Sequence, residues 1–486
     1  MPRARHPDDY PRLAKRHKVI PRRDEPQPNG PDHPGTATSS NGPNPSEPDS
    51  IPVPNWRERY KSRHPKPSLH NARLAITAIG VACRNDLFHN KLLFGYQSDS
   101  FHHALHRLIG EISDHGIVRL RTILSDRFGF DLTEKHVRDA VTSLALEHCY
   151  DPVVDMLAEA EAAWDGEERL DRMAVDYFNT EDTPFNRAAM RKLMIAAVAR
   201  VREPGCKFDT IPVLESEEGL GKSTALRLLA MSDDNFSDAA IIGKDSREVQ
   251  ENLASVWIHE NAELGGMKKA EVEQVKNFAS KRYDEARPAY GHYWKSQPRH
   301  SVEVGTTNAD TYLQSQTGNR RFWPLKILAR IDLDKLKRDR LQLWGEAAYW
   351  QSKGESLVLD EDLWTAAGEA QEERRVKDPW EDALANIPKV ASVWNSELYQ
   401  HENVQIIHVV GGQERVASED LLAHVLKIPV GQQTRNDAMR LAEVMKTLNW
   451  ERPPRNNKMA IPGKPKQVRG YFRRVPIPPE GEQLSF

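Results

Sequence analysis

The sequence lacks the features of disulfide-rich, zinc-binding and membrane-spanning proteins. Its three cysteines, Cys83, Cys149 and Cys206, stand far apart, which excludes a disulfide framework and a zinc site with clustered ligands. We expect buried thiols instead. No run approaches the roughly 18 to 20 apolar residues that cross a bilayer, and the first residues lack the apolar centre of a signal peptide. These absences predict a cytoplasmic protein with no membrane contact.

Large aliphatic residues are also scarce over residues 1–70, where prolines recur every few positions among Asn, Ser, Gly, Lys and Arg. Such a stretch cannot bury enough apolar surface to offset chain entropy, so it predicts a disordered, Pro-rich basic tail. Its basic patches, 15–18 and 57–66, fit a solvated tail better than a nucleic-acid contact. The net charge of -3 is an average that hides such local patterning.

The remaining sequence has periodic apolar residues. Residues 71–150 show mostly helical spacing and predict a helical domain, with a helix over 131–146 that Thr133 caps. After Gly205, short β-rich runs alternate with helical segments, which predicts a parallel sheet whose ligands lie beyond the strand carboxyl ends. The three runs are 210–214, 256–258 and 301–304.

The predicted sheet and the helical part before it occupy residues 151–345. A helical connector is expected over 346–388, and a basic C-terminal domain over 389–486.

The segment 215–224, ESEEGLGKST, follows a predicted strand and opens a predicted helix. In that context backbone N–H groups and a helix N-terminus converge on nucleotide phosphates, which is the arrangement of a P-loop. Lys222 is predicted to reach the β- and γ-phosphates of ATP, and the Ser223 hydroxyl to bind Mg²⁺. Ser216 replaces the first glycine of the motif, which is tolerable if its backbone angles are ordinary. The predicted nucleotide-binding residues are Ser216, Glu217, Glu218, Gly219, Leu220, Gly221, Lys222, Ser223 and Thr224.

An apolar run that ends in acid, 255–260, is typical of a Walker B strand. Its last residue, Glu260, is predicted to help hold Mg²⁺ and to face the attacking water. Glu263 is a second catalytic candidate, and its alternative role is a local cap or ion pair. The usual pattern has adjacent Asp and Glu, and His259 fills the first place here, so the sequence leaves the division of roles between Glu260 and Glu263 open.

Two further motifs follow the third β-rich run. Asn308 ends the segment 301–308 and is predicted to orient the lytic water, as a sensor residue does. Arg320 and Arg321 lie between a glycine turn and an aromatic strand, and we predict that at least one is an arginine finger for a neighbouring subunit. The alternative role for one of the two is a structural ion pair.

Cationic and aromatic residues interleave between the Walker B run and the sensor strand, which is typical of contacts to nucleic acid. The predicted DNA loop spans 290–299. The alternative is a solvated helix followed by an Arg287–Asp284 brace. The predicted DNA-binding residues are Arg287, Tyr290, Lys295 and Arg299.

The C-terminal domain contains no acidic residue from Arg452 to Arg474. Two helical segments followed by a basic stretch rich in Pro and Gly predict a winged-helix-like domain that binds DNA. Winged helices also mediate protein contacts, and the charge bias favours DNA. The predicted contact residues are Arg452, Arg455, Lys464, Lys466 and Arg469.

Taken in order, these motifs resemble the virulence-associated protein E family of phage and mobile-element ATPases, which is similar to the superfamily III helicases. The residues that carry the resemblance lie between about 150 and 345. They are Tyr150–Leu157 (YDPVVDML), Trp164–Leu170 (WDGEERL), Val198–Lys207 (VARVREPGCK), Asp284–Gly291 (DEARPAYG) and Thr317–Trp323 (TGNRRFW).

The resemblance implies an ATP-dependent DNA helicase or translocase that acts as a hexameric ring in the replication of a mobile element, in the cytoplasm of a bacterial host. We expect an ASCE or AAA+-like P-loop NTPase core, an α/β fold, between the helical and winged-helix-like domains. A separate primase or polymerase chain is expected to supply priming. The alternative is a DNA-binding initiator that ATP switches without processive unwinding. A small-molecule kinase gives no role to Asn308, the paired arginines or the basic C-terminus.

Overall fold

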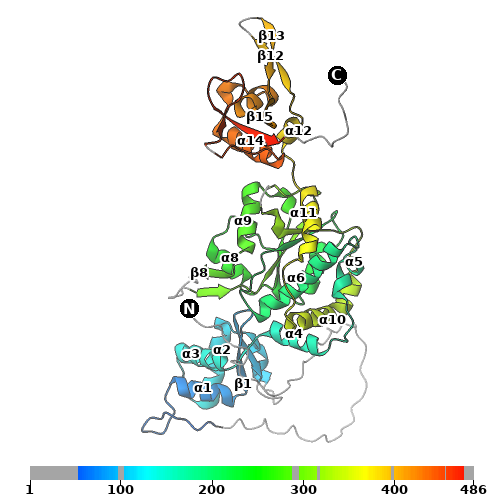
Figure 1. Ribbon diagram of the computed structural model, residues 1–486. Coiled ribbons are helices and arrows are strands. Elements are labelled where there is room, and N and C mark those ends of the chain that lie inside the picture. The colour runs from blue at the N-terminus through cyan, green and yellow to red at the C-terminus, as the bar shows by residue number, and fades with distance from the viewer. Residues whose placement is uncertain are drawn as a thin grey trace, which may run out of the picture. The chain divides into compact units, whose positions relative to one another are not determined.

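The computed structural model describes residues 53–96, 103–286, 295–314, 318–395, 399–454 and 456–474 (Figure 1). No helix among these residues is long and apolar enough to cross a membrane.

The N-terminal part, residues 53–150, contains a small sheet as well as helices. The sheet has the order β3-β2-β1-β4, and the helix α3 is capped by the Thr133 hydroxyl, which accepts from the His136 amide at 3.2 Å. Its elements are α1 (Leu69–Ala78), β1 (Val81–Asp86), β2 (Lys91–Tyr96), β3 (Gly110–Glu111), α2 (Asp114–Phe128), α3 (Glu134–Glu147) and β4 (Cys149–Tyr150). The helical domain predicted from sequence therefore misses four strands, because β1 and β2 are half-buried and lack a clear alternation.

The parallel sheet predicted from the sequence is present and has five strands. Its order is β11-β5-β10-β7-β6, and every neighbouring pair is parallel. The strands are β5 (Ile211–Glu215), β6 (Phe236–Ser237), β7 (Ile258–Asn261), β10 (Val302–Thr307) and β11 (Phe322–Lys326). β5, β7 and β10 are buried along their whole length, although their sequences, IPVLE, IHEN and VEVGTT, include polar residues.

Helices cover both faces of this sheet (Figure 1). One core unites the sheet with α4 (Pro152–Ala162), α6 (Pro184–Arg202), α7 (Lys222–Leu229) and α10 (Leu333–Ser352). A second core packs α9 (Lys269–Ala279) against β5 and β11. The other helices of this region are α5 (Met173–Asp176), α8 (Ser246–Leu253) and α11 (Trp364–Glu373). Two helix-covered faces leave the strand carboxyl ends as the open edge of the sheet.

A short hairpin lies between β7 and β10 in the sequence. Its strands, β8 (Tyr283–Ala286) and β9 (Lys295–Pro298), pair antiparallel, with Tyr283 opposite Pro298. This hairpin falls where the sequence predicted the DNA loop.

The C-terminal module has its own core, which includes Trp380 and Leu384 of α12. It therefore begins near residue 378, about one helix before the predicted boundary at 389. Its elements are α12 (Pro379–Ala385), β12 (Val390–Asn395), β13 (Gln400–Gln405), β14 (His408–Val410), β15 (Gln413–Ala417), α13 (Ser418–Asp420), α14 (Arg435–Thr447), β16 (Lys458–Met459) and β17 (Val468–Arg474). The sheet order is β14-β15-β17-β16, and β12 pairs with β13 in a separate hairpin.

Candidate functional site

The loop between β5 and α7 folds around the side chain of Lys222. Its Nζ donates to the Ser216 hydroxyl at 2.7 Å and lies within hydrogen-bond distance of two carbonyls, Ser216 O at 3.0 Å and Glu217 O at 3.2 Å. Gly219 and Gly221 have φ values of 84° and 97°, which glycine adopts without strain. Ser216 is not among the positive-φ residues. The departure from the usual motif thus keeps ordinary backbone geometry and adds a hydroxyl that the lysine uses.

The same lysine joins the loop to the sensor strand. Its Nζ donates to Asn308 Oδ1 at 2.8 Å. Asn308 follows β10, which pairs on one side with β5 and on the other with β7. Burial lowers the pKa of Lys222, and the Glu260 carboxylate opposes that effect. The strand order therefore brings together residues that lie 86 positions apart in the sequence.

Glu260 ends at the same edge of the sheet, where two hydroxyls hold one of its oxygens. Ser223 Oγ donates to Glu260 Oε1 at 2.8 Å, and Thr306 Oγ1 donates to the same oxygen at 2.6 Å. The other oxygen, Oε2, is buried and has no hydrogen-bond partner among the described residues. A buried carboxylate oxygen without a partner costs free energy. A hydroxyl beside an unpaired carboxylate oxygen is a donor set that fits Mg²⁺ and its bound water.

Glu263 is not brought into this group. It lies in the turn after β7, is exposed, and has left-handed backbone angles with φ 54°. Among the described residues no hydrogen bond joins its side chain to Lys222, Ser223 or Glu260. Of the two acidic candidates, the geometry selects Glu260.

The paired arginines differ in their surroundings. Both lie in the short helical turn Asn319–Arg321 before β11. Arg321 is half-buried, and its Nε lies 3.7 Å from Asp209 Oδ2. Arg320 is exposed, and its side chain forms no ion pair within the described parts of the chain. One arginine thus has the structural partner that the sequence allowed for, and the other projects from the surface.

A buried ion pair beneath the site was missed by sequence reasoning. His259 Nδ1 lies 2.6 Å from Glu303 Oε2, and Asn261 Nδ2 donates to the same oxygen at 2.8 Å. Burial opposes charge on both groups, yet each partner stabilises the other, so the pKa of His259 is raised and that of Glu303 is lowered. The signal in the sequence was His259 itself, which occupies the place of the usual Walker B aspartate. Its partner on β10 could be identified only from strand pairing.

A second missed cluster anchors the base of the phosphate loop. Glu215 ends β5, and its Oε1 accepts from Tyr312 OH at 2.6 Å and from Arg374 Nε at 3.0 Å. Burial raises the pKa of Glu215, against the effect of these two donors. The three residues span 160 positions of sequence, and no local pattern connects them.

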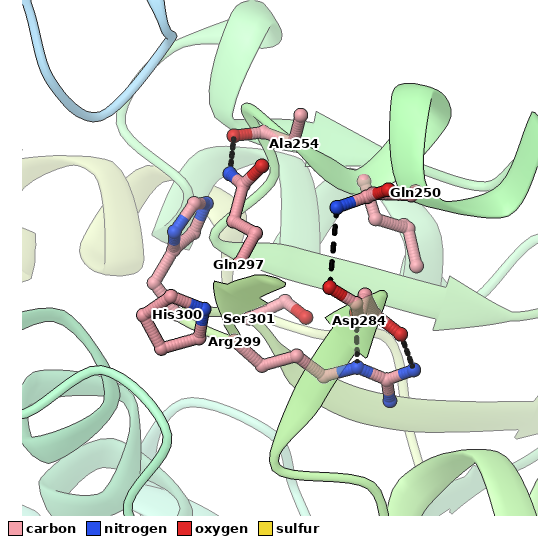
Figure 2. A pocket seen from close by; sticks show the side chains of 9 residues that line it. Gln250, Ala254, Asp284, Gln297, Arg299, His300 and Ser301 are labelled. Atoms are coloured by element: carbon pink, nitrogen blue, oxygen red, sulfur yellow. Dashed lines mark hydrogen bonds and ion pairs between the residues drawn. The ribbon is translucent and has the colours of Figure 1, made fainter. Parts of the chain in front are cut away.

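The β8–β9 hairpin changes the role assigned to Arg299. This residue was predicted to contact DNA, but it is buried, and its guanidinium is held by Asp284 at 2.6 and 2.7 Å (Figure 2). It also donates to Phe278 O at 2.5 Å and stacks over the Phe278 ring at 3.6 Å. Arg299 therefore braces the base of the hairpin. Asp284, which the sequence paired with Arg287 in the alternative to DNA contact, forms this brace with Arg299.

The other candidates for the DNA loop are Arg287, Tyr290 and Lys295. Arg287 and Tyr290 lie outside the described residues, and only the backbone of Lys295, in β9, is described. A small pocket lies at the base of the hairpin between Gln250, Gln297 and His300 (Figure 2). Burial lowers the pKa of His300 to about 4.

The predicted C-terminal DNA contacts fall into two groups. Lys466 and Arg469 are exposed and have no ion-pair partner within the described residues, whereas Lys464 Nζ lies 2.8 Å from Glu419 and 2.9 Å from Asp420. The charge of Lys464 is thus already paired, and the residue ties the loop 460–467 to α13. Arg452 is exposed and donates to Tyr471 OH at 3.3 Å. Arg455 lies outside the described residues.

The fold and the site describe an α/β protein with a parallel sheet and a lysine, acid and amide at its carboxyl edge. Residues 157–376 match the profile of the virulence-associated protein E-like domain. The chain therefore contains a virulence-associated protein E-like domain.

Other comparisons give weaker likenesses. No curated protein matches the chain. Among solved structures, the apo structure of the NrS-1 C-terminal region (305–718) is 10% identical with a TM-score of 0.42, covering 84% of this chain and 99% of that chain. An A-form apo structure of the NrS-1 C-terminal region (305–718) is 11% identical with a TM-score of 0.43, at the same coverage.

Proposed function

We propose that the chain is an ATP-dependent DNA helicase or translocase that serves the replication of a phage or another mobile element. The virulence-associated protein E-like domain at residues 157–376 supports the biological setting. The chemistry rests on the site at the carboxyl edge of β5, β7 and β10. The strand order β11-β5-β10-β7-β6 is the order of an ASCE P-loop core, with the phosphate loop after β5.

The observation that carries the proposal is the environment of Glu260. Its Oε1 is fixed by Ser223 and Thr306, and its Oε2 is buried without a partner among the described residues. The two hydrogen bonds to Oε1 fix the orientation of the carboxylate and therefore the position of Oε2. In the proposed enzyme Glu260 is the general base: its Oε2 accepts a hydrogen bond from the attacking water and so positions that water.

The other residues divide the remaining tasks. Lys222 exchanges its contacts within the loop for the β- and γ-phosphate oxygens, and Asn308, which it already contacts, orients the attacking water. Ser223 and Glu260 would hold Mg²⁺, which supplies charge neutralisation for the triphosphate. Backbone N–H groups of residues 216–224 surround the phosphates, at the N-terminus of α7.

Arg320 is the proposed arginine finger. It is exposed and has no ion-pair partner among the described residues, whereas Arg321 has Asp209 nearby. A finger in a ring of subunits reaches the nucleotide of the neighbour and stabilises charge on the transferring phosphoryl group. We therefore propose a hexameric ring in which the site of one protomer is completed by Arg320 of the next.

DNA contact is proposed for the C-terminal module. The order α12, β15, α13, α14, β16 and β17 supports a winged-helix-like fold, in which the loop 460–467 would be the wing. Lys466 and Arg469 are exposed on this loop and its flanking strand, and the described part of the chain gives them no acidic partner. In this arrangement the wing contacts phosphates while α14 approaches a groove.

The decisive experiment is strand displacement on forked DNA. We expect ATP-dependent unwinding that is lost in Lys222→Ala and in Glu260→Gln, with DNA binding retained in both. ATP hydrolysis with no displacement and no translocation would replace the motor by the alternative, an ATP-switched initiator. Absence of ATP hydrolysis in the unmodified chain would overturn both.

A further inference from the structure

The segment that leads into α1 is a folded turn, although the sequence predicted a disordered tail up to residue 70. Trp56 is buried and packs edge-on against Phe128 and Phe130, at ring distances of 5.2 and 5.1 Å. Asn71 is fully buried, and its side chain donates to two backbone carbonyls, Glu58 O at 2.7 Å and Lys66 O at 2.9 Å. These contacts fix both ends of residues 57–66, which we call the basic turn.

The backbone of the basic turn closes on itself. The Tyr60 amide donates to His64 O at 2.9 Å, the Arg63 amide to Tyr60 O at 2.9 Å, and the Lys66 amide to Glu58 O at 3.0 Å. The side-chain carbonyl of Asn71 accepts from the Arg57 amide at 3.1 Å. The backbone of the basic turn is thus held in one conformation by hydrogen bonds, which fixes the positions from which its side chains extend.

The basic turn displays positive charge. The turn carries five Lys and Arg residues against one acid, Glu58, and all five cations are exposed. They are Arg57, Arg59, Lys61, Arg63 and Lys66. Within the described residues none of them has an acidic partner. Elsewhere in the same domain arginines do find acids, since Arg121 pairs with Asp131 at 2.8 Å and Arg73 with Glu147 at 2.7 Å.

One of these cations occupies an unfavourable backbone position. Arg63 has φ 67°, in the left-handed region where Gly, Asn and Asp are preferred because they have little or no steric conflict there. A turn shaped for stability alone would place one of those residues at this position. Replacement of Arg63 by Asn should therefore relieve a strain of about 1 kcal/mol or more.

An exposed aromatic ring lies among the charges. Tyr60 is 51% exposed, and Lys66 Nζ lies 5.6 Å from the centroid of its ring. Cations that follow a phosphate backbone, together with a ring on which a base can stack, are the elements of single-strand recognition. Duplex DNA offers phosphates but no free base face at this ring. The combination favours an unpaired strand.

We propose that the basic turn, residues 57–66, binds single-stranded DNA through phosphate contacts from its cations and base stacking on Tyr60. The site is separate from the C-terminal module and from the phosphate site. The proposal shares with the proposed function only the choice of DNA as the polymer, and it requires no ATP hydrolysis.

The first test compares salt dependence on the full chain. In a fourfold variant, Arg57→Gln, Lys61→Gln, Arg63→Asn and Lys66→Gln, we expect weaker binding to a fluorescent oligo-dT strand. The slope of log affinity against log salt should become shallower by about 3, because each lost single-strand phosphate contact accounts for roughly 0.7. Binding to a duplex of equal length should change less. ATP hydrolysis measured without DNA should be unchanged, which separates failure of this site from failure of the proposed function.

A matched control is present in the same domain. Arg119 and Lys135 are exposed and lie on α2 and α3, and the double variant Arg119→Gln, Lys135→Gln removes charge away from the turn. We expect at most a small change in its salt slope. An equal loss per charge in this control, or an unchanged slope in the fourfold variant, would overturn the proposal. Binding of the unmodified chain to vesicles of acidic lipid, lost in the fourfold variant while oligo-dT binding is unchanged, would assign the turn to a membrane surface instead.

Two single variants test the mode of binding and keep the fold intact. Tyr60→Leu should weaken oligo-dT binding roughly tenfold while Tyr60→Phe keeps it, since stacking needs only the ring. Arg63→Asn should weaken binding while the melting temperature stays the same or rises, because Asn tolerates the left-handed backbone. Unchanged oligo-dT affinity in both Tyr60→Leu and Arg63→Asn would show that the turn does not contact the strand.

Discussion

The phosphate site and the exposed cations of the basic turn and C-terminal module use charge in opposite ways. At the phosphate site, Lys222 and Glu260 are buried, and each has hydrogen bonds to groups on another strand or loop. In the basic turn and the wing, Lys61, Lys466 and Arg469 lie in solvent without acidic partners among the described residues. The contrast indicates that one substitution at the phosphate site should abolish a step, whereas surface substitutions should act by small, additive, salt-dependent amounts.

The sharpest form of this contrast is Glu260→Gln. The amide keeps the shape of the side chain and can still accept from Ser223 and Thr306, but it cannot act as a base. We expect ATP turnover to fall by about 10³-fold or more while nucleotide affinity changes little, which is comparable with the loss of a strong electrostatic contribution. Turnover within a few fold of the unmodified chain, measured with retained nucleotide binding, would place the general base elsewhere.

Substitutions at the two adjacent arginines should have different effects, on ATP turnover for Arg320 and on stability for Arg321. Arg320→Ala should lower ATP turnover by about 10³-fold, the usual effect of losing a finger, and leave the melting temperature unchanged. Arg321→Ala removes the partner of Asp209 and should mainly lower the melting temperature. Thermal melts and steady-state ATPase on both variants are the measurement. The reverse assignment, with Arg321 critical for turnover, would contradict our division of roles.

His300 is buried and uncharged, and we expect its effect on stability to depend on pH. Burial lowers the pKa of His300 from its ordinary value of 6.5 to about 4, so the unfolded chain binds a proton at higher pH than the folded chain does. Stability from this residue is therefore complete above about pH 6.5 and is lost as pH falls towards 4, by at most about 3 kcal/mol. His300→Leu should flatten the free energy of unfolding over this window in urea titrations. An equally steep pH dependence in the variant would assign the effect to other groups.

A smaller effect is expected where only one of two hydrogen bonds to Glu260 is removed. Thr306→Val deletes the donor to Oε1 and keeps the side-chain volume, while Ser223 still donates to that oxygen. Loss of one hydrogen bond to a charged group predicts a decrease in kcat of about tenfold, with KM little changed. Thr306→Ser keeps the hydroxyl and should restore turnover. If Thr306→Val reduces only the melting temperature, Thr306 has a structural role alone.

The smallest effects belong to the wing. Lys466→Gln and Arg469→Gln should each weaken duplex binding modestly and make the salt slope shallower by about 1. Lys464→Gln should leave the slope unchanged and lower the melting temperature, because Lys464 is paired with Glu419 and Asp420. Equal salt slopes for all three variants would remove the distinction between paired and unpaired cations.

The structure brings Lys222, Asn308 and Glu260 to one edge of the sheet, as the sequence predicted, because the segments that carry them obey local rules; their role in nucleotide binding stays a prediction. A strand, a glycine loop and a helix in succession define the position of Lys222, and apolar runs that end in polar residues define Glu260 and Asn308. The parallel sheet could be predicted from the same alternation. The choice between Glu260 and Glu263 could be made only from the structure, in which Ser223 and Thr306 donate to Glu260 and Glu263 lies in an exposed turn.

The failures share a physical cause, which is that charge in a sequence does not reveal its partner. Arg299 and Lys464 looked like DNA contacts, but each is paired with acids that lie 15 and more than 40 positions away. For the basic turn the error was the opposite one, because a folded surface was predicted to be a disordered tail. Its composition resembled a tail, and only Trp56 and Asn71, which pack against later parts of the domain or bind its backbone, make it a folded surface.

The central claim is that one protomer's phosphate site works with Arg320 of the next, and mixing two inactive variants tests it most directly. Glu260→Gln retains the arginine, and Arg320→Ala retains the acid. At interfaces between the two variants, an intact site meets an intact finger, so the mixture should recover ATP turnover well above either variant alone. No recovery in mixtures shown to co-assemble would contradict a finger that acts between subunits.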